Sequence, residues 1–372
     1  MNIPRLLLSS IVALSLATPI HANVVRSKPR IQLAILLDTS SSMDGLIDQA
    51  RTQLWRVVNE LARAKKGEAT PDLQVALYEY GNDNLSAEQG YVRRVLPLTA
   101  DLDRVSEELF ALKTNGGSEF CGTVIDYAAK GLSWSGSNND LKLIFIAGNE
   151  EFTQGSIDFR DSCRKAITQG IVVNTIFCGD RQVGINTKWK EGADLADGRY
   201  MAIDQNSKVV DIPAPQDKEI AELGLKLNKT YIGYGSSGSA GAARQGAQDA
   251  NVAANASANL ERQVAKASAA YSNEGWDLVD AAKTGKVDVD KLDAKDLPEE
   301  MKKMTPAQRK AYVEENTKKR AEIQSKIKSL DDARKKYVAE QRKKLPPAKG
   351  TLDAAVISAV RDEGTKRGYA FP

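Results

Sequence analysis

The residues whose types and spacing suit metal binding best are Asp38, Ser40 and Ser42, which alternate in the segment 38–43, DTSSSM. One carboxylate and two hydroxyls supply only hard oxygen ligands, the kind that Mg²⁺, Mn²⁺ and Ca²⁺ prefer. Alternate spacing on a tight turn lets the three oxygens point to one place. The pattern therefore predicts a divalent-cation site, with Mg²⁺ as the first candidate and Mn²⁺ or Ca²⁺ as alternatives.

Two further polar clusters, at 115–119 and 148–151, are expected to lie beside this one. The apolar run 31–37, which precedes Asp38, is typical of a strand buried on both faces of a parallel sheet. In doubly wound α/β sheets, ligands bind at the carboxyl ends of the strands, near the point where the strand order reverses. The three clusters are far apart in sequence, and this architecture would bring them together.

The elements that must position these residues alternate between strand and helix from residue 30 to about residue 234. Helices between strands imply right-handed crossovers and an α/β fold with a doubly wound, mostly parallel sheet. Pro97 places its strand at a sheet edge, because proline cannot donate to a central ladder. Strands are predicted at 31–37, 74–80, 94–98, 141–147, 171–177 and 200–203, and helices at 46–64, 102–112, 122–132, 159–169 and 188–196.

After Tyr234 the composition changes, and an all-α, partly elongated C-terminal region is predicted. The Gly/Ser-rich stretch 235–241 reads as a linker, and 242–372 as helical. Thr305, Pro306 and Gln308 supply an N-cap, a first-position proline and a capping box for a helix that is expected to reach about Lys344. A final helix is predicted over 352–366.

Charge divides along the same boundary. Residues 23–235 contain 25 Lys and Arg against 29 Asp and Glu, whereas residues 236–372 contain 26 against 20. The basic region could pair with the acidic one or reach an anionic partner, although solvated lysine-rich helices are ordinary. A coiled-coil seam on the long helix would allow self-association, but two arginines, Arg320 and Arg334, occupy core positions of its register. The seam would consist of Val313, Ile323, Ile327, Leu330 and Tyr337.

Residues 1–22 have the pattern of a secretory signal peptide: Arg5, an apolar run at 6–17, and small Ala22 at the expected cleavage point. No later segment is apolar enough over a sufficient length to span a bilayer, so a periplasmic or secreted location is expected. Cleavage would also remove His21, the only histidine. A chain without histidine has neither a Ser-His-Asp nor a Cys-His mechanism, nor a zinc site with histidine ligands.

Three cysteines remain in the exported chain, and an oxidising compartment favours one disulfide with one thiol left over. Cys163 lies near the start of a predicted helix and Cys178 at the end of the next strand, so both are expected on the same side of the sheet. This favours a Cys163–Cys178 bridge. Cys121 follows a loop on that side too, so the alternative pairings stay open.

With these motifs in place, residues 30–206 resemble the von Willebrand factor A (VWA) domain family. The resemblance rests on the sequence D-x-S-x-S, Asp38 to Ser42, at the end of the first strand of an alternating α/β domain. The family includes integrin inserted domains and bacterial exported modules. Its metal-ion-dependent adhesion site (MIDAS) holds one divalent cation, and an acidic group of a partner protein completes the ligand shell.

The resemblance implies five metal ligands here, of which three match the family pattern fully. A Gly-Gly-Thr loop is usual in the family, and here it reads Gly-Gly-Ser, so Ser118 takes the place of the threonine. Thr123 is a less favoured substitute, because it should lie inside the following helix. Asn149 stands where the family has an aspartate, which loses a charge that nearby Glu119, Glu150 or Glu151 could restore. The implied ligand set is Asp38, Ser40, Ser42, Ser118 and Asn149.

These features predict an exported, non-enzymatic protein-binding module that uses a cation to engage an Asp or Glu of its partner. The alternative is a metal-free cell-envelope scaffold that has a degenerate site and acts through its basic helices. A metal-assisted hydrolase is a third class, in which Glu119, Glu150 or Glu151 would be the general base. No phosphate-binding G-x-x-x-x-G-K loop is present, which argues against nucleotide use, and no nucleic-acid partner is expected.

Overall fold

The computed structural model describes residues 28–207, 211–345 and 350–371. The predicted signal peptide, residues 1–22, lies outside the described residues. Within them, a six-stranded sheet has the order β4-β3-β1-β5-β6-β7, and only β4 runs antiparallel to its neighbour. The prediction of a doubly wound, mostly parallel sheet is confirmed, and the strand that contains Pro97 is indeed at an edge. The strands are β1 (Arg30–Asp38), β3 (Asp72–Tyr80), β4 (Val92–Thr99), β5 (Leu141–Gly148), β6 (Val172–Cys178) and β7 (Tyr200–Ile203).

Helices cover both faces of this sheet, because its central strands are apolar on both sides. Alternate residues of β1 divide between two cores: Leu33 and Leu37 face one layer, and Ala34 and Leu36 face the other. The first layer contains α1 (Asp44–Ala62), α2 (Leu102–Ala111) and α13 (Leu352–Lys366). The second contains α3 (Cys121–Gly131), α4 (Phe159–Thr168) and α6 (Trp189–Asp194), and the short α5 (Arg181–Asn186) packs against α6 and β7.

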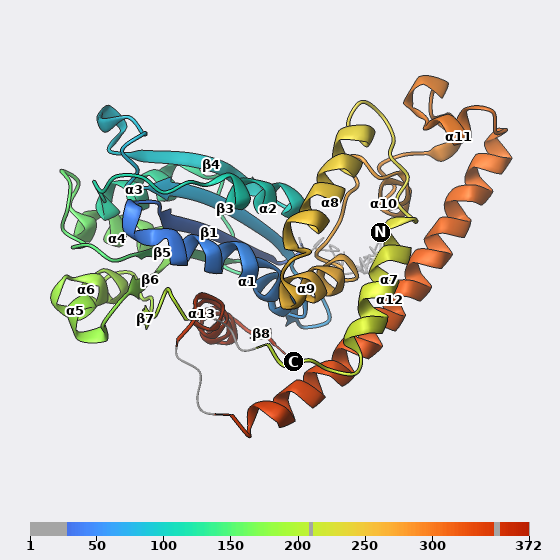
Figure 1. The fold of residues 1–372 in the computed structure, drawn as a ribbon. Coiled ribbons are helices and arrows are strands. Elements are labelled where there is room, and N and C mark those ends of the chain that lie inside the picture. Colours follow the sequence, from blue (N-terminus) through green and yellow to red (C-terminus); the bar gives the residue numbers. More distant parts are fainter. Residues whose placement is uncertain (1–27, 208–210, 346–349, 372) are drawn as a thin grey trace, which may run out of the picture.

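The helix α13 completes the first layer, although it follows β7 only after a long excursion of the chain (Figure 1). It packs against α1 and against β5, β6 and β7. The short strands β2 (Lys65–Lys66) and β8 (Tyr369–Ala370) pair antiparallel just after α1 and α13. The end of the described chain is therefore part of the α/β unit.

Between β7 and α13 lie helices that we call the appended helices. The predicted linker 235–241 is only partly irregular, because α8 already begins at Gly238. Short 3₁₀ helices occur both here and in the α/β unit: η1 (Ser41–Met43), η2 (Ala87–Gln89), η3 (Val289–Lys291) and η4 (Ala294–Asp296). The appended helices are α7 (Asp217–Asn228), α8 (Gly238–Val252), α9 (Ala256–Lys266), α10 (Leu278–Lys283), α11 (Glu299–Lys302) and α12 (Pro306–Arg342). None of the helices in the described ranges is both long and apolar enough to cross a bilayer.

The long helix α12 begins with the predicted capping box. The hydroxyl of Thr305 accepts a bond from the Gln308 N–H, and the Gln308 side chain accepts one from the Thr305 N–H. Its 37 residues run along the outer side of the appended helices (Figure 1). At a rise of about 1.5 Å per residue, the helix is roughly 55 Å long.

Most residues of the predicted coiled-coil seam of α12 pack against other helices of this chain, whereas Tyr337 is exposed. Val313 and Ile327 are buried in two small apolar clusters with other appended helices. Arg320 donates to Asp277 and Asp280, and its guanidinium lies 4.1 Å from the centroid of the Tyr231 ring. Arg320, one of the two arginines that disfavoured a coiled coil, thus pairs with carboxylates of this chain. Self-association through α12 stays a prediction.

The predicted disulfide is wrong: Cys121, Cys163 and Cys178 are all free and buried. Cys163 on α4 belongs to the core of the second layer, whereas Cys178 at the end of β6 belongs to the core of the first. The sheet separates the two thiols, which the sequence pattern could not show. Burial raises the pKa of Cys163 to about 12, so this thiol stays protonated at neutral pH.

Arg262 attaches the appended helices to the α/β unit. This fully buried residue of α9 donates from Nη1 to Asp103 of α2 at 2.7 Å. Its guanidinium also lies 4.6 Å from the centroid of the Trp55 ring on α1. The Tyr271 hydroxyl donates to the second oxygen of Asp103 at 2.6 Å. A buried charge network therefore holds α9 against α1 and α2.

We expect Arg262→Ala to lower the free energy of unfolding by roughly 3–5 kcal/mol, because it leaves the Asp103 carboxylate buried without its counter-ion. Urea unfolding followed by circular dichroism would measure this. Arg244→Ala is the matched control, since Arg244 joins α8 to Glu107 of the same helix α2 in a more exposed pair and should contribute less than about 1 kcal/mol. Equal losses in the two variants would contradict the assignment.

Candidate metal centre

The carboxyl end of β1 brings three loops together. β1 lies between β3 and β5, at the point where the strand order reverses, which is the usual ligand position in such sheets. The Asn115 N–H donates to the Thr39 carbonyl at 2.9 Å, and the Ser41 N–H donates to the Gly116 carbonyl at 2.9 Å. These bonds hold the loop before α3 against the turn after β1.

Four of the five predicted ligand residues are linked by hydrogen bonds. The Ser40 N–H donates to Asp38 Oδ1 at 2.8 Å, and the hydroxyls of Ser40 and Ser42 are 3.2 Å apart. Ser42 Oγ in turn lies 3.4 Å from Asn149 Oδ1 and 3.2 Å from Asn149 Nδ2. Asp38 and Ser40 are buried at the base of this group, whereas Ser42 is exposed and Asn149 half-buried at its rim.

Ser118, the fifth predicted ligand, is half-buried in the loop that Ser41 and Thr39 hold. Its side chain forms no hydrogen bond with the other four within the described ranges. Thr123, the alternative, is buried inside α3, as the sequence predicted. The structure therefore places the loop of Ser118 at the site without joining its hydroxyl to the group.

Glu119 is buried against Asp38. Gly81 covers both residues: a Cβ atom there would lie 2.7 Å from Asp38 Oδ1 and 2.8 Å from Glu119 Cγ. Gly148 lies on another side, where a Cβ would be 3.0 Å from Asp38 Oδ2. The absence of side chains at these two glycines lets the backbone approach both carboxyl groups closely.

The two carboxyl groups carry the main electrostatic feature of the site. Burial raises the pKa of Asp38 to about 6, and burial together with the Asp38 charge raises that of Glu119 to about 9. When both are ionised, Asp38 Oδ2 and Glu119 Oε2 are buried with no hydrogen-bond donor. The pair must then hold a proton or bind a cation.

The other acidic and nucleophilic groups near the site differ in their exposure. Glu150 and Glu151 are exposed, although the charge of Glu150 still acts on Asp38 and Glu119. Tyr80 is fully buried and donates to the Ala147 carbonyl at 3.0 Å. Burial raises the pKa of Tyr80 and of the neighbouring Cys121 thiol far above neutrality. Among the described residues, no three His, Cys, Asp or Glu side chains gather at one point.

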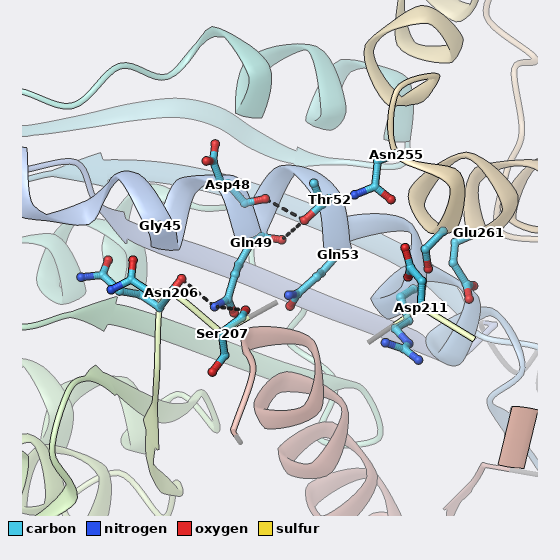
Figure 2. Close-up of a pocket in the computed structure, with 13 residues that line it drawn as sticks. Gly45, Asp48, Gln49, Thr52, Gln53, Asn206, Ser207, Asp211, Asn255 and Glu261 are labelled. Carbon is cyan, nitrogen blue, oxygen red and sulfur yellow. Dashed lines mark hydrogen bonds between the residues drawn. The ribbon is translucent and has the colours of Figure 1, made fainter. Parts of the chain in front are cut away.

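A cavity of about 570 Å³ lies beside α1, next to the turn after β1 (Figure 2). Gln49 lines it and donates to the carbonyls of Asp204 and Gln205, while its own oxygen accepts from the Leu352 N–H at the start of α13. The Gln205 amide donates to the Ser42 carbonyl at 3.0 Å. A chain of amide hydrogen bonds thus connects α13 with the turn after β1.

Sequence reasoning missed this connection, although Gln49 and Gln53 gave a signal. Both lie four residues apart on the buried face of α1, where an apolar residue would be expected. The Gln53 oxygen accepts from the Asp353 N–H at 2.8 Å. Polar residues on a core-facing stripe indicate a specific buried partner, and here the partner is the first turn of α13.

The family model of the von Willebrand factor type A domain matches residues 32–193 of this chain. This part of the protein is therefore a VWA domain, a type that commonly serves in protein interactions. The match includes Asp38, Ser40, Ser42, Ser118 and Asn149. No curated protein matches the chain.

Several solved structures are similar to about half of the chain. BatB from Bacteroides thetaiotaomicron is 17% identical with a TM-score of 0.35, over 47% of this chain and 90% of that one. An aerotolerance-related membrane protein from Bacteroides fragilis is 17% identical with a TM-score of 0.33, over 47% and 93%. Proximal thread matrix protein 1 from the mussel byssus, with a zinc-occupied MIDAS motif, is 11% identical with a TM-score of 0.34, over 47% and 42%.

The raised pKa values predict how the stability of the metal-free protein depends on pH. Unfolded carboxyl groups titrate near pH 4, so above that pH the folded protein holds more protons than the unfolded chain. Stability should therefore fall as the pH rises from about 5 to 9, through the pKa values of Asp38 and Glu119. Melting temperatures in EDTA would show this, and Glu119→Gln should flatten the slope. Parallel curves for Glu119→Gln and the wild type would contradict the assignment, and Glu150→Gln is the exposed control.

Proposed function

We propose that the protein is an exported, non-enzymatic binding module that holds a divalent cation, Mg²⁺ first and Mn²⁺ or Ca²⁺ as alternatives, at the end of β1. The proposed ligands are Asp38, Ser40, Ser42, Ser118 and Asn149. The partner would be a protein that offers an Asp or Glu side chain. The observation that carries the proposal is the convergence of Asp38, Ser40, Ser42 and Asn149, with Asp38 Oδ2 buried and unpartnered.

The donor set fits a hard cation. Asp38 supplies the negative charge at the base, and the hydroxyls of Ser40 and Ser42 lead from it toward the surface. The Ser40 N–H fixes Asp38 Oδ1, which leaves Oδ2 for another ligand. Oxygen ligands without thiolate or imidazole favour Mg²⁺, Ca²⁺ or Mn²⁺ over softer metals.

The exposure of the rim supports the approach of an outside carboxylate. Ser42 is exposed and Asn149 half-buried, so a side chain of a partner can approach from that side. The Asn149 amide carries no charge and does not repel an incoming Asp or Glu. A cation bound here would keep an electrophilic position for that carboxylate, because most of the proposed ligands are neutral.

Export supports the same proposal. The signal-peptide pattern at residues 1–22 would direct the chain to the periplasm or the medium. Extracellular calcium-binding modules have dissociation constants of roughly 10⁻⁴–10⁻³ M, so a site of modest affinity would suit this location.

The metal-free scaffold stays as a second candidate because of α12. Lys310, Lys318, Lys328 and Lys336 are all exposed along this helix. Such a row would bind an anionic partner by charge alone, with an affinity that falls as salt rises. This candidate would be favoured if partner binding does not change when EDTA is added but is lost in roughly 0.5 M salt.

Loading the wild-type protein with Mn²⁺ should give strong water-proton relaxation, which an added Asp-containing peptide should lower because its carboxylate replaces metal-bound water. The same peptide with Asn in place of Asp should have little effect. Asp38→Asn should lose Mn²⁺ binding by roughly 10- to 100-fold, as expected for loss of a charged ligand. Electron paramagnetic resonance of free Mn²⁺ would measure the affinity.

Asp161→Asn is the matched control for this experiment, because Asp161 is an exposed carboxylate on α4. It should bind Mn²⁺ like the wild type. Retention of full Mn²⁺ affinity by Asp38→Asn, or equal effects of the Asp and Asn peptides, would count against the proposed function.

A further inference from the structure

Glu119 is the acidic residue that the structure places inside the proposed metal site. The sequence offered Glu119, Glu150 and Glu151 as sources of the charge that is missing at Asn149. Glu150 and Glu151 are exposed, whereas Glu119 is only 3% exposed. Burial therefore singles out Glu119 among the three.

The backbone on both sides of Glu119 is fixed. Its N–H donates to Gln154 Oε1 at 3.3 Å, and its carbonyl accepts from the Cys121 N–H at 3.1 Å. The next residue, Phe120, packs edge-on against Tyr91 with 5.6 Å between the ring centroids. The Glu119 side chain thus enters the site from an anchored loop, next to the start of α3.

Glu119 and Asp38 are in close contact, and no positively charged side chain among the described residues balances their charge. A Cβ atom at Gly81 would touch both side chains at once, at 2.7 and 2.8 Å. Each residue has one carboxylate oxygen that is buried without a hydrogen-bond donor, Asp38 Oδ2 and Glu119 Oε2. In the described part of the chain, no lysine or arginine is ion-paired with either residue. The pair is therefore balanced either by a proton that it holds or by a cation bound from solution.

We propose that Glu119 is the second anionic ligand of the metal site and replaces the carboxylate that is absent at Asn149. The inference rests on the proposed function. Asp38 and Glu119 together supply two negative charges, which match one divalent cation. Asn149 then closes the rim as a neutral oxygen donor and leaves that side open to the carboxylate of a partner.

This assignment explains why the neutral residue at position 149 is compatible with metal binding. In a site with Asp38 as its single carboxylate, a divalent cation would be held by one charge and neutral oxygens. Glu119 restores the charge from a different loop, on the buried side of the site. The second negative charge thus comes from position 119 instead of position 149, and the total charge of the ligands is unchanged.

Mg²⁺ titration calorimetry and Mn²⁺ resonance on four variants would test the proposal. Glu119→Gln should weaken binding by roughly 10- to 100-fold. Adding Asn149→Asp to that variant should restore most of the affinity, because a carboxylate returns to the site from the other side. Glu150→Gln, the exposed neighbour, should bind like the wild type, and Asp38→Asn should be weakened at least as much as Glu119→Gln.

The outcomes separate this inference from the proposed function. If Glu119→Gln binds as tightly as the wild type while Asp38→Asn binds much more weakly, the metal site stands and the role of Glu119 is wrong. If Asn149→Asp fails to rescue Glu119→Gln, the exchange of charge between the two positions is wrong. If the wild type binds no Mg²⁺ or Mn²⁺ at millimolar concentration, both fail. Circular dichroism of each variant confirms that it is folded.

Discussion

Two buried carboxyl groups in contact, without a positive side chain to balance them, are the constraint on which the site depends. At a separation of about 4 Å and an effective dielectric constant near 20, two like charges repel by about 4 kcal/mol. The fold accepts this arrangement at the end of β1, where Asp38 and Glu119 have no ion-pair partner among the described residues. Either a shared proton or a bound cation must offset the repulsion. The raised pKa values describe the first state, and the surrounding hydroxyls suit the second.

The rest of the domain holds this pair in place. The parallel order of β3, β1 and β5 sets three loops side by side, and backbone bonds from Ser41 and Thr39 join two of them. Gly81 and Gly148 let backbone approach the carboxyl groups closely. On the other side of the turn, Gln205 and Gln49 extend the hydrogen-bond chain to α13. The helix that completes the sheet layer is thus in contact, through amides, with the loop that carries Ser42.

Much of the α/β architecture could be predicted from sequence because its signals are local. The apolar run 31–37 marks β1, and Thr305 with Gln308 marks the start of α12, since each depends on neighbours within a few residues. What could not be predicted depends on distant packing. One example is the face of the sheet on which each cysteine lies, and another is the packing of α13 against α1. Arg320 looked like a defect in a coiled coil because its partners, Asp277 and Asp280, are about forty residues away.

The candidate site divides in the same way. The alternate spacing of Asp38, Ser40 and Ser42 is visible in the sequence. Asn149 could be predicted as well, because it lies at the end of a recognisable strand. Glu119 could be named only as one of three acidic neighbours, because side-chain burial decides between them.

The most direct measurement is the anomalous diffraction signal of Mn²⁺ in a crystal of the protein. The account predicts one peak at about 2 Å from a carboxylate oxygen of both Asp38 and Glu119. No peak at the end of β1 in saturating Mn²⁺, with these two residues in mutual contact, would contradict it.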